Sequence, residues 1–309
     1  MNILITGING FVGSNMYHYF SEGNNIFGID ISKDISKQKS KYYNWNNLKD
    51  IPDVDAIIHL AGLAHDTEGG ANERDYYEIN VGLTQKIFEH YLSSSAKIFI
   101  HFSSVKAVAD SVIGEFLSED TIAQPKTHYG KSKLASEKYL SNQIIPAFKN
   151  IYILRPAMIH GPGNKGNLNL LYSMVRKGIP YPLGNFKNQR SFTSIGNLLF
   201  IVNLLLAGNI KSGTYNICDD EPLSTIEIVE MIYGSLGKKN MVLNIPCNII
   251  QKLAALGNIL KLPLNSERLQ KMTESYIVSN EKIKRELSLQ SLPVSSRTGM
   301  LRTLNTLQN

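Results

Sequence analysis

Short apolar runs recur along the first half of the chain and alternate with longer segments of mixed polarity. The runs cover residues 2–6, 25–29, 56–60, 97–102 and 151–154. Each run has the length of a buried strand, and the segments between the runs are long enough to hold helices. This alternation predicts an α/β fold built on a doubly wound parallel sheet.

One of the intervening segments has a clear helical period. We expect a crossover helix over residues 75–91, because these apolar side chains share one face: Tyr76, Ile79, Leu83, Ile87 and Tyr91. Residues 32–41 are polar and lysine-rich and show no such period. They predict a loop or short helix, with a weak strand near Tyr42.

The pattern changes after residue 160. Residues 160–166 are rich in glycine and predict a loop, which leads into a helix near 168–177. This change predicts a boundary between a first domain at 1–163 and a smaller C-terminal α/β lobe at 164–309, some segments of which can return to the first domain. Further elements are expected after the boundary: a strand at 213–218 and helices at 225–236 and 248–260.

Composition narrows the class of protein. With 309 residues and 43% hydrophobic content, the chain can bury a core large enough for one large domain or two lobes. The net charge of +6 fits a phosphate-bearing substrate. The basic residues are dispersed, and no basic block is interleaved with aromatic residues, so we expect no nucleic-acid partner.

Cysteine usage and hydropathy indicate the compartment. Cys218 and Cys247 are too few for a disulfide framework, and no Cys/His spacing predicts a metal site. The sequence has neither the basic leader of a signal peptide nor a run of 18 apolar residues. We expect a cytoplasmic protein without a membrane span.

Three glycines follow the first apolar run. Gly7, Gly10 and Gly13 have the spacing of a tight turn that opens a helix, whose free N–H groups can hold a pyrophosphate. Asp30 ends the second apolar run, where an acidic side chain binds a ribose hydroxyl and would repel a 2′-phosphate. Together they indicate NAD over NADP. The alternative is an ordinary tight turn followed by an unrelated strand-end aspartate.

The candidate chemistry is carried by Tyr129 and Lys133. A phenol and an ammonium four residues apart share one face of a helix. The cation is expected to lower the pKa of the phenol from about 10 toward working pH and so make it a proton-transfer group at an alcohol or ketone. The alternative is a solvated helix face.

With these residues in place, the chain resembles the extended short-chain dehydrogenase/reductase family, in the branch of NAD-dependent nucleotide-sugar epimerases, dehydratases and reductases that includes the UDP-glucose and UDP-N-acetylglucosamine 4-epimerases. The resemblance covers almost the whole length. It rests on an ordered series of motifs: Thr6 to Gly13, Asp30, His59 to Gly62, Asn80-Val81, Ser103-Ser104, Tyr129 to Lys133, Arg155-Pro156, Gly161 to Gly163, and Arg190.

The resemblance implies a Rossmann domain at 1–163 that binds NAD and a lobe that mainly binds the nucleotide sugar. It implies three catalytic residues, Ser104, Tyr129 and Lys133. The implied NAD-binding residues are Gly7, Asn9, Gly10, Phe11, Val12, Gly13, Asp30, Leu60, Ala61, Gly62, Asn80, Tyr129 and Lys133. The implied substrate-binding residues are Ser104, Lys106, Asn167, Leu168, Arg190 and Arg268, with Lys271 as an alternative to Arg268.

Two histidines carry separate expectations. His59 is expected to be a core histidine, and His65 is equally compatible with a substrate-facing and an ordinary loop position. The resemblance also implies a homodimer formed through the helices at 75–91 and 129–142.

The residues after Ser104 discriminate among the reactions of this family. Dehydratases that resemble this chain carry Asp-Glu there, whereas this chain has Val105 and Lys106, so dehydration is disfavoured. We therefore expect an NAD-dependent 4-epimerase acting on a UDP-hexose or UDP-N-acetylhexosamine in surface polysaccharide precursor synthesis. The main alternative is an NAD(P)H-dependent 4-reductase of a UDP-4-keto-6-deoxy-N-acetylhexosamine. A non-catalytic cofactor-sensing protein is less compatible, because Tyr129 and Lys133 are both present.

Overall fold

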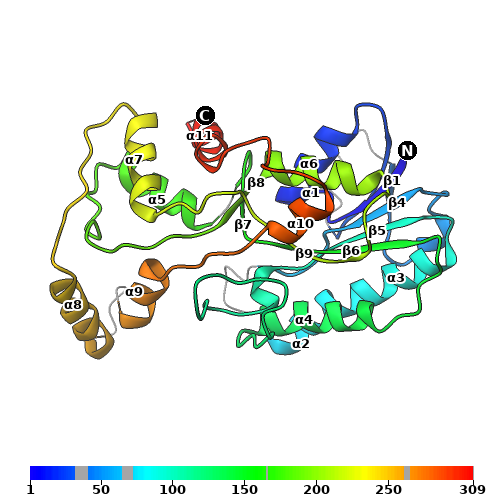
Figure 1. Ribbon diagram of the computed structural model, residues 1–309, viewed down its shortest axis with the longest axis horizontal. Coiled ribbons are helices and arrows are strands. Elements are labelled where there is room, and N and C mark those ends of the chain that lie inside the picture. The colour runs from blue at the N-terminus through cyan, green and yellow to red at the C-terminus, as the bar shows by residue number, and fades with distance from the viewer. Residues whose placement is uncertain (32–40, 65–71, 165, 261–264, 309) are drawn as a thin grey trace.

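The chain folds into a sheet-containing lobe and a smaller lobe of helices beside it (Figure 1). The computed structural model describes residues 1–31, 41–64, 72–164, 166–260 and 265–308. Two expectations lie outside the described residues: the loop or short helix at 32–40, and the position of His65.

Seven strands form one sheet, in the order β3-β2-β1-β4-β5-β6-β9. Every pairing in it is parallel, which confirms the predicted doubly wound fold. The chain starts in the middle of the sheet and builds outward in both directions, so the order reverses between β1 and β4, where α/β proteins bind ligands. The bounds are β1 (Asn2–Thr6), β2 (Asn25–Ile29), β3 (Lys41–Tyr43), β4 (Ala56–His59), β5 (Ile98–Phe102), β6 (Asn150–Pro156) and β9 (Gly213–Ile217).

Helices cover both faces of the sheet (Figure 1). Ile3 and Ile5 of β1 point to one face and pack with α1 (Phe11–Phe20) and α6 (Ile195–Leu206). Leu4 points to the other face, where α3 (Leu83–Ser93) and α4 (His128–Ser141) contribute to the core. Strands buried on both faces explain why the predicted strands read as continuous apolar runs.

The crossover helix expected at 75–91 is present but is not a regular α-helix. It consists of α2 (Glu73–Tyr77), a π-helical turn η3 (Glu78–Gly82) and α3. Such π-helical turns occur often at functional sites. Here the turn contains the buried side chain of Asn80.

The second lobe has a separate apolar core. It is formed by α5 (Asn167–Arg176), α7 (Thr225–Ser235) and α11 (Ser296–Thr306). A short parallel pair, β7 (Met158–His160) and β8 (Phe192–Ser194), lies between the lobes, and α8 (Cys247–Leu260) and α9 (Ser266–Thr273) extend from the second lobe (Figure 1). None of the described helices combines the length and apolar character needed to cross a bilayer.

Three elements beyond residue 163 belong to the sheet lobe. Strand β9 extends the sheet beside β6. Helix α6 packs on α1, and α10 (Glu281–Glu286) contacts β9. The second lobe is therefore assembled from segments that alternate along the chain with segments of the first.

Candidate active site

The site begins at the glycine turn between β1 and α1. Gly7 has a φ of 71°, a conformation that L side chains rarely adopt, and its N–H donates to the Ile29 carbonyl at 2.7 Å. A Cβ on Gly13 would lie 2.2 Å from the Gly7 carbonyl oxygen. A side chain at Gly13 would therefore force the helix away from the strand.

The helix that follows has a free amino end. Its N-cap is Gly10, with no side-chain cap, and its first turn contains no acidic residue. The N–H groups of Phe11, Val12 and Gly13 at this end are therefore suited to an anion. A dinucleotide pyrophosphate fits this geometry, whereas a helix end capped by a carboxylate would not accept it.

Asp30 lies beside this turn. Its Oδ2 accepts a 2.9 Å hydrogen bond from the Asn9 N–H, and Tyr42 donates its hydroxyl to Asn9 Oδ1 at 2.8 Å. The carboxylate is half-buried at the end of β2. An acidic group in this place fits the ribose hydroxyls of NAD and would repel the 2′-phosphate of NADP.

The residues that follow β4 form the next part of the candidate NAD site. Leu60 is half-buried, and the Ala61 N–H donates to Thr6 Oγ1 at 3.1 Å. A Cβ on Gly62 would lie 2.8 Å from Asn80 Oδ1 and 3.1 Å from Lys133 Nζ. A glycine at 62 thus lets three separate elements meet at this strand end.

Asn80 connects those elements. Its Oδ1 accepts from the Leu63 N–H at 2.7 Å, and its Nδ2 donates to the Leu63 carbonyl at 3.1 Å and to Ser132 Oγ at 2.9 Å. It therefore ties the π-helical turn to the loop after β4 and to α4. The adjacent His59 is fully buried between Thr6 and Thr84, which confirms that it is a core histidine.

Ser104 and Tyr129 form the candidate proton-transfer pair. Ser104 follows β5 and accepts a 3.1 Å hydrogen bond from the Lys106 N–H. Its side chain lies beside the phenol of Tyr129 and acts to lower the pKa of that phenol. Thr127 caps the amino end of α4 and so fixes where Tyr129 enters the site.

The expected lowering of the Tyr129 pKa by Lys133 is wrong for this structure. Burial raises the pKa of Tyr129 above 10, and this outweighs the lowering effect of Ser104. The Lys133 ammonium does not compensate, because its Nζ donates to the Phe102 carbonyl at 2.8 Å. Burial lowers the pKa of Lys133 itself to about 8, against the opposing charge of Glu137.

Substrate-side candidates come from both lobes. Lys106 donates from Nζ to the Asp110 carbonyl at 2.7 Å and lies 4.3 Å from the centre of the Tyr276 ring. Arg190 donates to the Glu274 carbonyl at 3.2 Å and to the Lys271 carbonyl. These contacts bring Lys106 and Arg190 to the region where the lobes meet.

The other substrate-side candidates are less well placed. Asn167 is exposed at the start of α5, but Leu168 packs in the core of the second lobe. The side chain of Leu168 is therefore not available to a ligand, which leaves only its backbone. Arg268 and Lys271 are exposed on α9, where Lys271 pairs with Glu267 at 2.6 Å.

Comparison with known proteins identifies the family. Residues 3–218 match the family described as the NAD dependent epimerase/dehydratase family. The chain belongs to this family. The recognition made from the ordered motifs is thereby confirmed.

Relatives and solved structures agree with this assignment. The chain is 29% identical to a UDP-glucose 4-epimerase of Vibrio cholerae over 79% of each protein. It is 28% identical to an N-acetyl-alpha-D-glucosaminyl-diphospho-ditrans,octacis-undecaprenol 4-epimerase of Escherichia coli O157:H7, over 79% of this chain and 75% of the relative. A UDP-glucuronic acid 4-epimerase from Bacillus cereus, solved with NAD, has a similar fold, with a TM-score of 0.76, 21% identity and coverage of 100% and 99% of the two chains.

One group in this NAD dependent epimerase/dehydratase family member was missed by the sequence analysis. Glu137 and Arg155 form a buried ion pair, with 2.6 Å between Glu137 Oε2 and Arg155 Nη2, and Ser103 donates to the same carboxylate. The available signal was the position of Glu137, one helical turn after Lys133. Nothing in the sequence pattern shows that Glu137 pairs with a residue of a strand.

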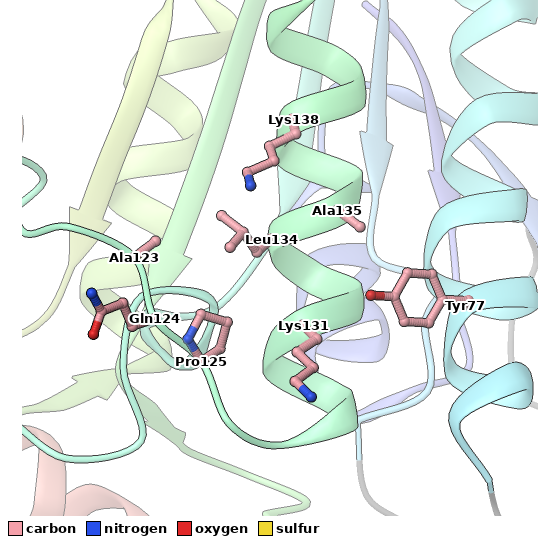
Figure 2. A pocket seen from close by; sticks show the side chains of 8 residues that line it. All are labelled: Tyr77, Ala123, Gln124, Pro125, Lys131, Leu134, Ala135 and Lys138. Atoms are coloured by element: carbon pink, nitrogen blue, oxygen red, sulfur yellow. The ribbon is translucent and has the colours of Figure 1, made fainter.

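A separate pocket lies on the outer face of α4, the face that carries Lys131, Leu134, Ala135 and Lys138 (Figure 2). It has a volume of about 330 Å³. Figure 2 shows Tyr77 of α2 pointing toward α4, with Ala135 on the facing side and Leu134 extending from the other side of the helix in this view. The remaining lining residues of the pocket are Ala123, Gln124 and Pro125.

Proposed function

We propose that this protein is an NAD-dependent 4-epimerase that acts on a UDP-hexose, specifically on a UDP-N-acetylhexosamine. The observation that carries the proposal is the placement of Ser104 beside Tyr129, where it acts to lower the pKa of the phenol, at the sheet edge that also presents the uncapped glycine turn and Asp30. The 4-epimerase names of the Vibrio cholerae and Escherichia coli relatives support it.

Each residue of the proposed site has a separate role in the reaction. NAD, when bound, supplies a reversible hydride acceptor. Tyr129 removes the proton of the C4 hydroxyl and later returns it, while Ser104 holds the sugar oxygen by a hydrogen bond. Because the pKa of Tyr129 is raised in this structure, the reaction requires the charge of Lys133 to act on the phenol when the site is filled. Lys106 and Arg190 are suited to the negative charges of the diphosphate.

The deciding experiment is incubation of the purified protein with UDP-GlcNAc without added NADH, followed by mass spectrometry and NMR of the sugar. We expect UDP-GalNAc to form up to an equilibrium mixture, and the reverse reaction to reach the same mixture. Tyr129→Phe serves as the inactive control. Stoichiometric oxidation of NADH with a 4-keto-6-deoxy sugar, and no interconversion, would favour the alternative 4-reductase.

A second candidate substrate is the same N-acetylhexosamine attached through a diphosphate to a polyprenyl lipid. The name of the Escherichia coli O157:H7 relative supports it. So does helix α8, on which four apolar side chains spaced 4, 3 and 4 residues apart are exposed: Ile249, Leu253, Leu256 and Leu260. The same assay with a lipid-linked substrate in detergent distinguishes the two, because only the accepted carrier will give a C4-inverted product.

We further propose that the protein is a cytoplasmic homodimer. The apolar members of the pocket on the outer face of α4 support an interface through α2 and α4, since Tyr77, Leu134 and Ala135 would be covered by a second copy. Both cysteines are free, which is compatible with a reducing compartment. Light scattering of wild type and Ala135→Glu tests the interface: we expect a dimer that the added buried charge dissociates.

A further inference from the structure

Three side chains next to the candidate active site form a buried polar network. Arg155 donates to Glu137 through Nε at 2.9 Å and through Nη2 at 2.6 Å, which makes a two-pronged ion pair. Ser103 donates its hydroxyl to the same carboxylate. All three residues are buried, with at most 8% of any of them exposed. The charge of Glu137 is therefore neither shielded by water nor free to move.

The network joins the two elements that carry the candidate catalytic residues, the end of β5 and α4, to β6. Ser103 lies between β5 and Ser104, and its N–H donates to the Leu154 carbonyl on β6 at 2.7 Å. Glu137 lies on α4 one turn after Lys133, whose Nζ bonds to the Phe102 carbonyl. Two adjacent turns of α4 are thus bound to the same strand end, one through Lys133 and one through Glu137.

Stability alone does not explain a buried ion pair at this place. The desolvation of two charges offsets much of their attraction, and apolar residues of similar size are often as stabilising. What an apolar pair could not provide is a fixed negative charge one helical turn from Lys133. We propose that Glu137, held by Arg155 and Ser103, is a positioning residue that keeps the Lys133 ammonium charged and fixed within one helical turn of Tyr129.

The other groups that face Lys133 do not replace this charge. On α4, the titratable neighbours of Lys133 are Glu137 and Tyr129. Two more titratable neighbours come from other elements: His59 from β4 and His101 from β5. Burial holds the pKa of both histidines far below 6.5, at about 3 for His59, so both are neutral at working pH. Arg155 on β6 adds a positive charge that Glu137 offsets. Among these neighbours, Glu137 is the group that favours the charged form of Lys133.

The test is a titration of Lys133 by NMR in isotope-labelled protein without substrate, with the signal assigned by its loss in Lys133→Arg. Glu137→Gln leaves the positive charge of Arg155 uncompensated, so we expect the Lys133 titration to move down by about one pH unit. Arg155→Met leaves the carboxylate without its partner, so we expect a shift in the opposite direction. The double variant should fall between them.

The signal of Lys149 is the internal control. It is a second buried lysine, bonded to the carbonyls of Tyr91, Ser94 and Ala96, and it should titrate alike in all variants. Thermal melting identifies any variant that does not fold. If one variant fails to fold, Arg155→Met and the double variant each still test the direction of the Lys133 shift. No shift of Lys133, or shifts of the same sign in the two single variants, would overturn the proposal.

The kinetic readout rests on the proposed function, and the NMR readout does not. In an active enzyme, the alkaline limb of the pH–turnover profile should move in the same direction as the Lys133 titration in each variant. A titration that shifts as expected in a protein without epimerase activity would refute the proposed function and leave the role of Glu137 intact. A merely structural role would lower turnover in both single variants without moving the limb in opposite directions.

Discussion

Lys133 Nζ donates a 2.8 Å hydrogen bond to the carbonyl oxygen of Phe102, so the ammonium is held on the end of β5 while the phenol of Tyr129 lies beside Ser104. The two residues share a helix face, but in this structure they do not share a proton-transfer contact. The pKa of Tyr129 is raised and that of Lys133 is lowered. Burial is the dominant cause for both groups, because it disfavours whichever form is charged.

The role of Tyr129 is tested by Tyr129→Phe. Loss of the proton-transfer group should lower turnover by about 10²–10⁴-fold and leave NAD binding nearly unchanged. Steady-state kinetics and NAD titration measure the two effects. Tyr77→Phe is a matched control, since Tyr77 lines the separate pocket at α4 (Figure 2) and should keep the wild-type rate. An unchanged rate in Tyr129→Phe would refute the assignment.

Much of the sheet lobe could be predicted because its strands are buried on both faces. The runs at 2–6 and 25–29 match β1 and β2, and the weak strand near Tyr42 is β3. The π-helical turn around Asn80 could not be predicted, because apolar residues at 79 and 83 fit α and π geometry equally well. Local sequence carries no sign of which turn is widened.

The site was harder to predict than the fold for a physical reason. The pairing of a phenol with an ammonium follows from a spacing of four residues, but the pKa values depend on burial and on tertiary partners. The Phe102 carbonyl that binds Lys133 is 31 residues away, and Arg155 is 18 residues from Glu137. Such contacts depend on how α4 docks on β5 and β6, which no local period specifies.

Cofactor preference should depend on Asp30. We expect the wild type to bind NAD about 10–100-fold more tightly than NADP, because the carboxylate bonds to ribose hydroxyls and repels a 2′-phosphate. In Asp30→Ala this ratio should fall toward one, as measured by titration with both cofactors. Asp53→Ala is the control, since Asp53 precedes β4 at the amino end of the strand. Equal affinities in the wild type would remove the argument for Asp30.

Acid should destabilise the protein through two buried histidines. His59 and His101 stack at 5.4 Å between ring centres, and burial lowers the pKa of His59 to about 3 and that of His101 well below 6.5. Because the unfolded chain binds these protons more readily, the stability from the neutral rings is complete above pH 6.5 and is lost as the pH falls below it.

Each histidine should remove about 1.4 kcal/mol of unfolding free energy for each pH unit below 6.5. Urea unfolding between pH 7 and pH 5 measures this slope. In His101→Gln the slope should fall by about one proton. A slope in the wild type that indicates no proton uptake would contradict the neutral, buried state of both rings.

The close approach at Gly62 gives the sharpest steric test. In Gly62→Ala, the added Cβ would lie 2.8 Å from Asn80 Oδ1 and 3.1 Å from Lys133 Nζ. Both neighbours are held by other hydrogen bonds, so the methyl group should displace the ammonium or the Asn80 bridge. We expect turnover to fall by about ten-fold or more, since small misplacements at a catalytic site have large effects.

Gly82→Ala is the matched control for this substitution. Gly82 ends the π-helical turn, and a Cβ there would meet no described atom within 4 Å. Its turnover should equal that of the wild type, and its melting temperature should not fall, because alanine favours a helical backbone. If the two variants keep equal, wild-type activity, the contact of Gly62 with Lys133 has no part in the chemistry. A loss confined to Gly62→Ala ties the end of β4 to the position of the catalytic lysine.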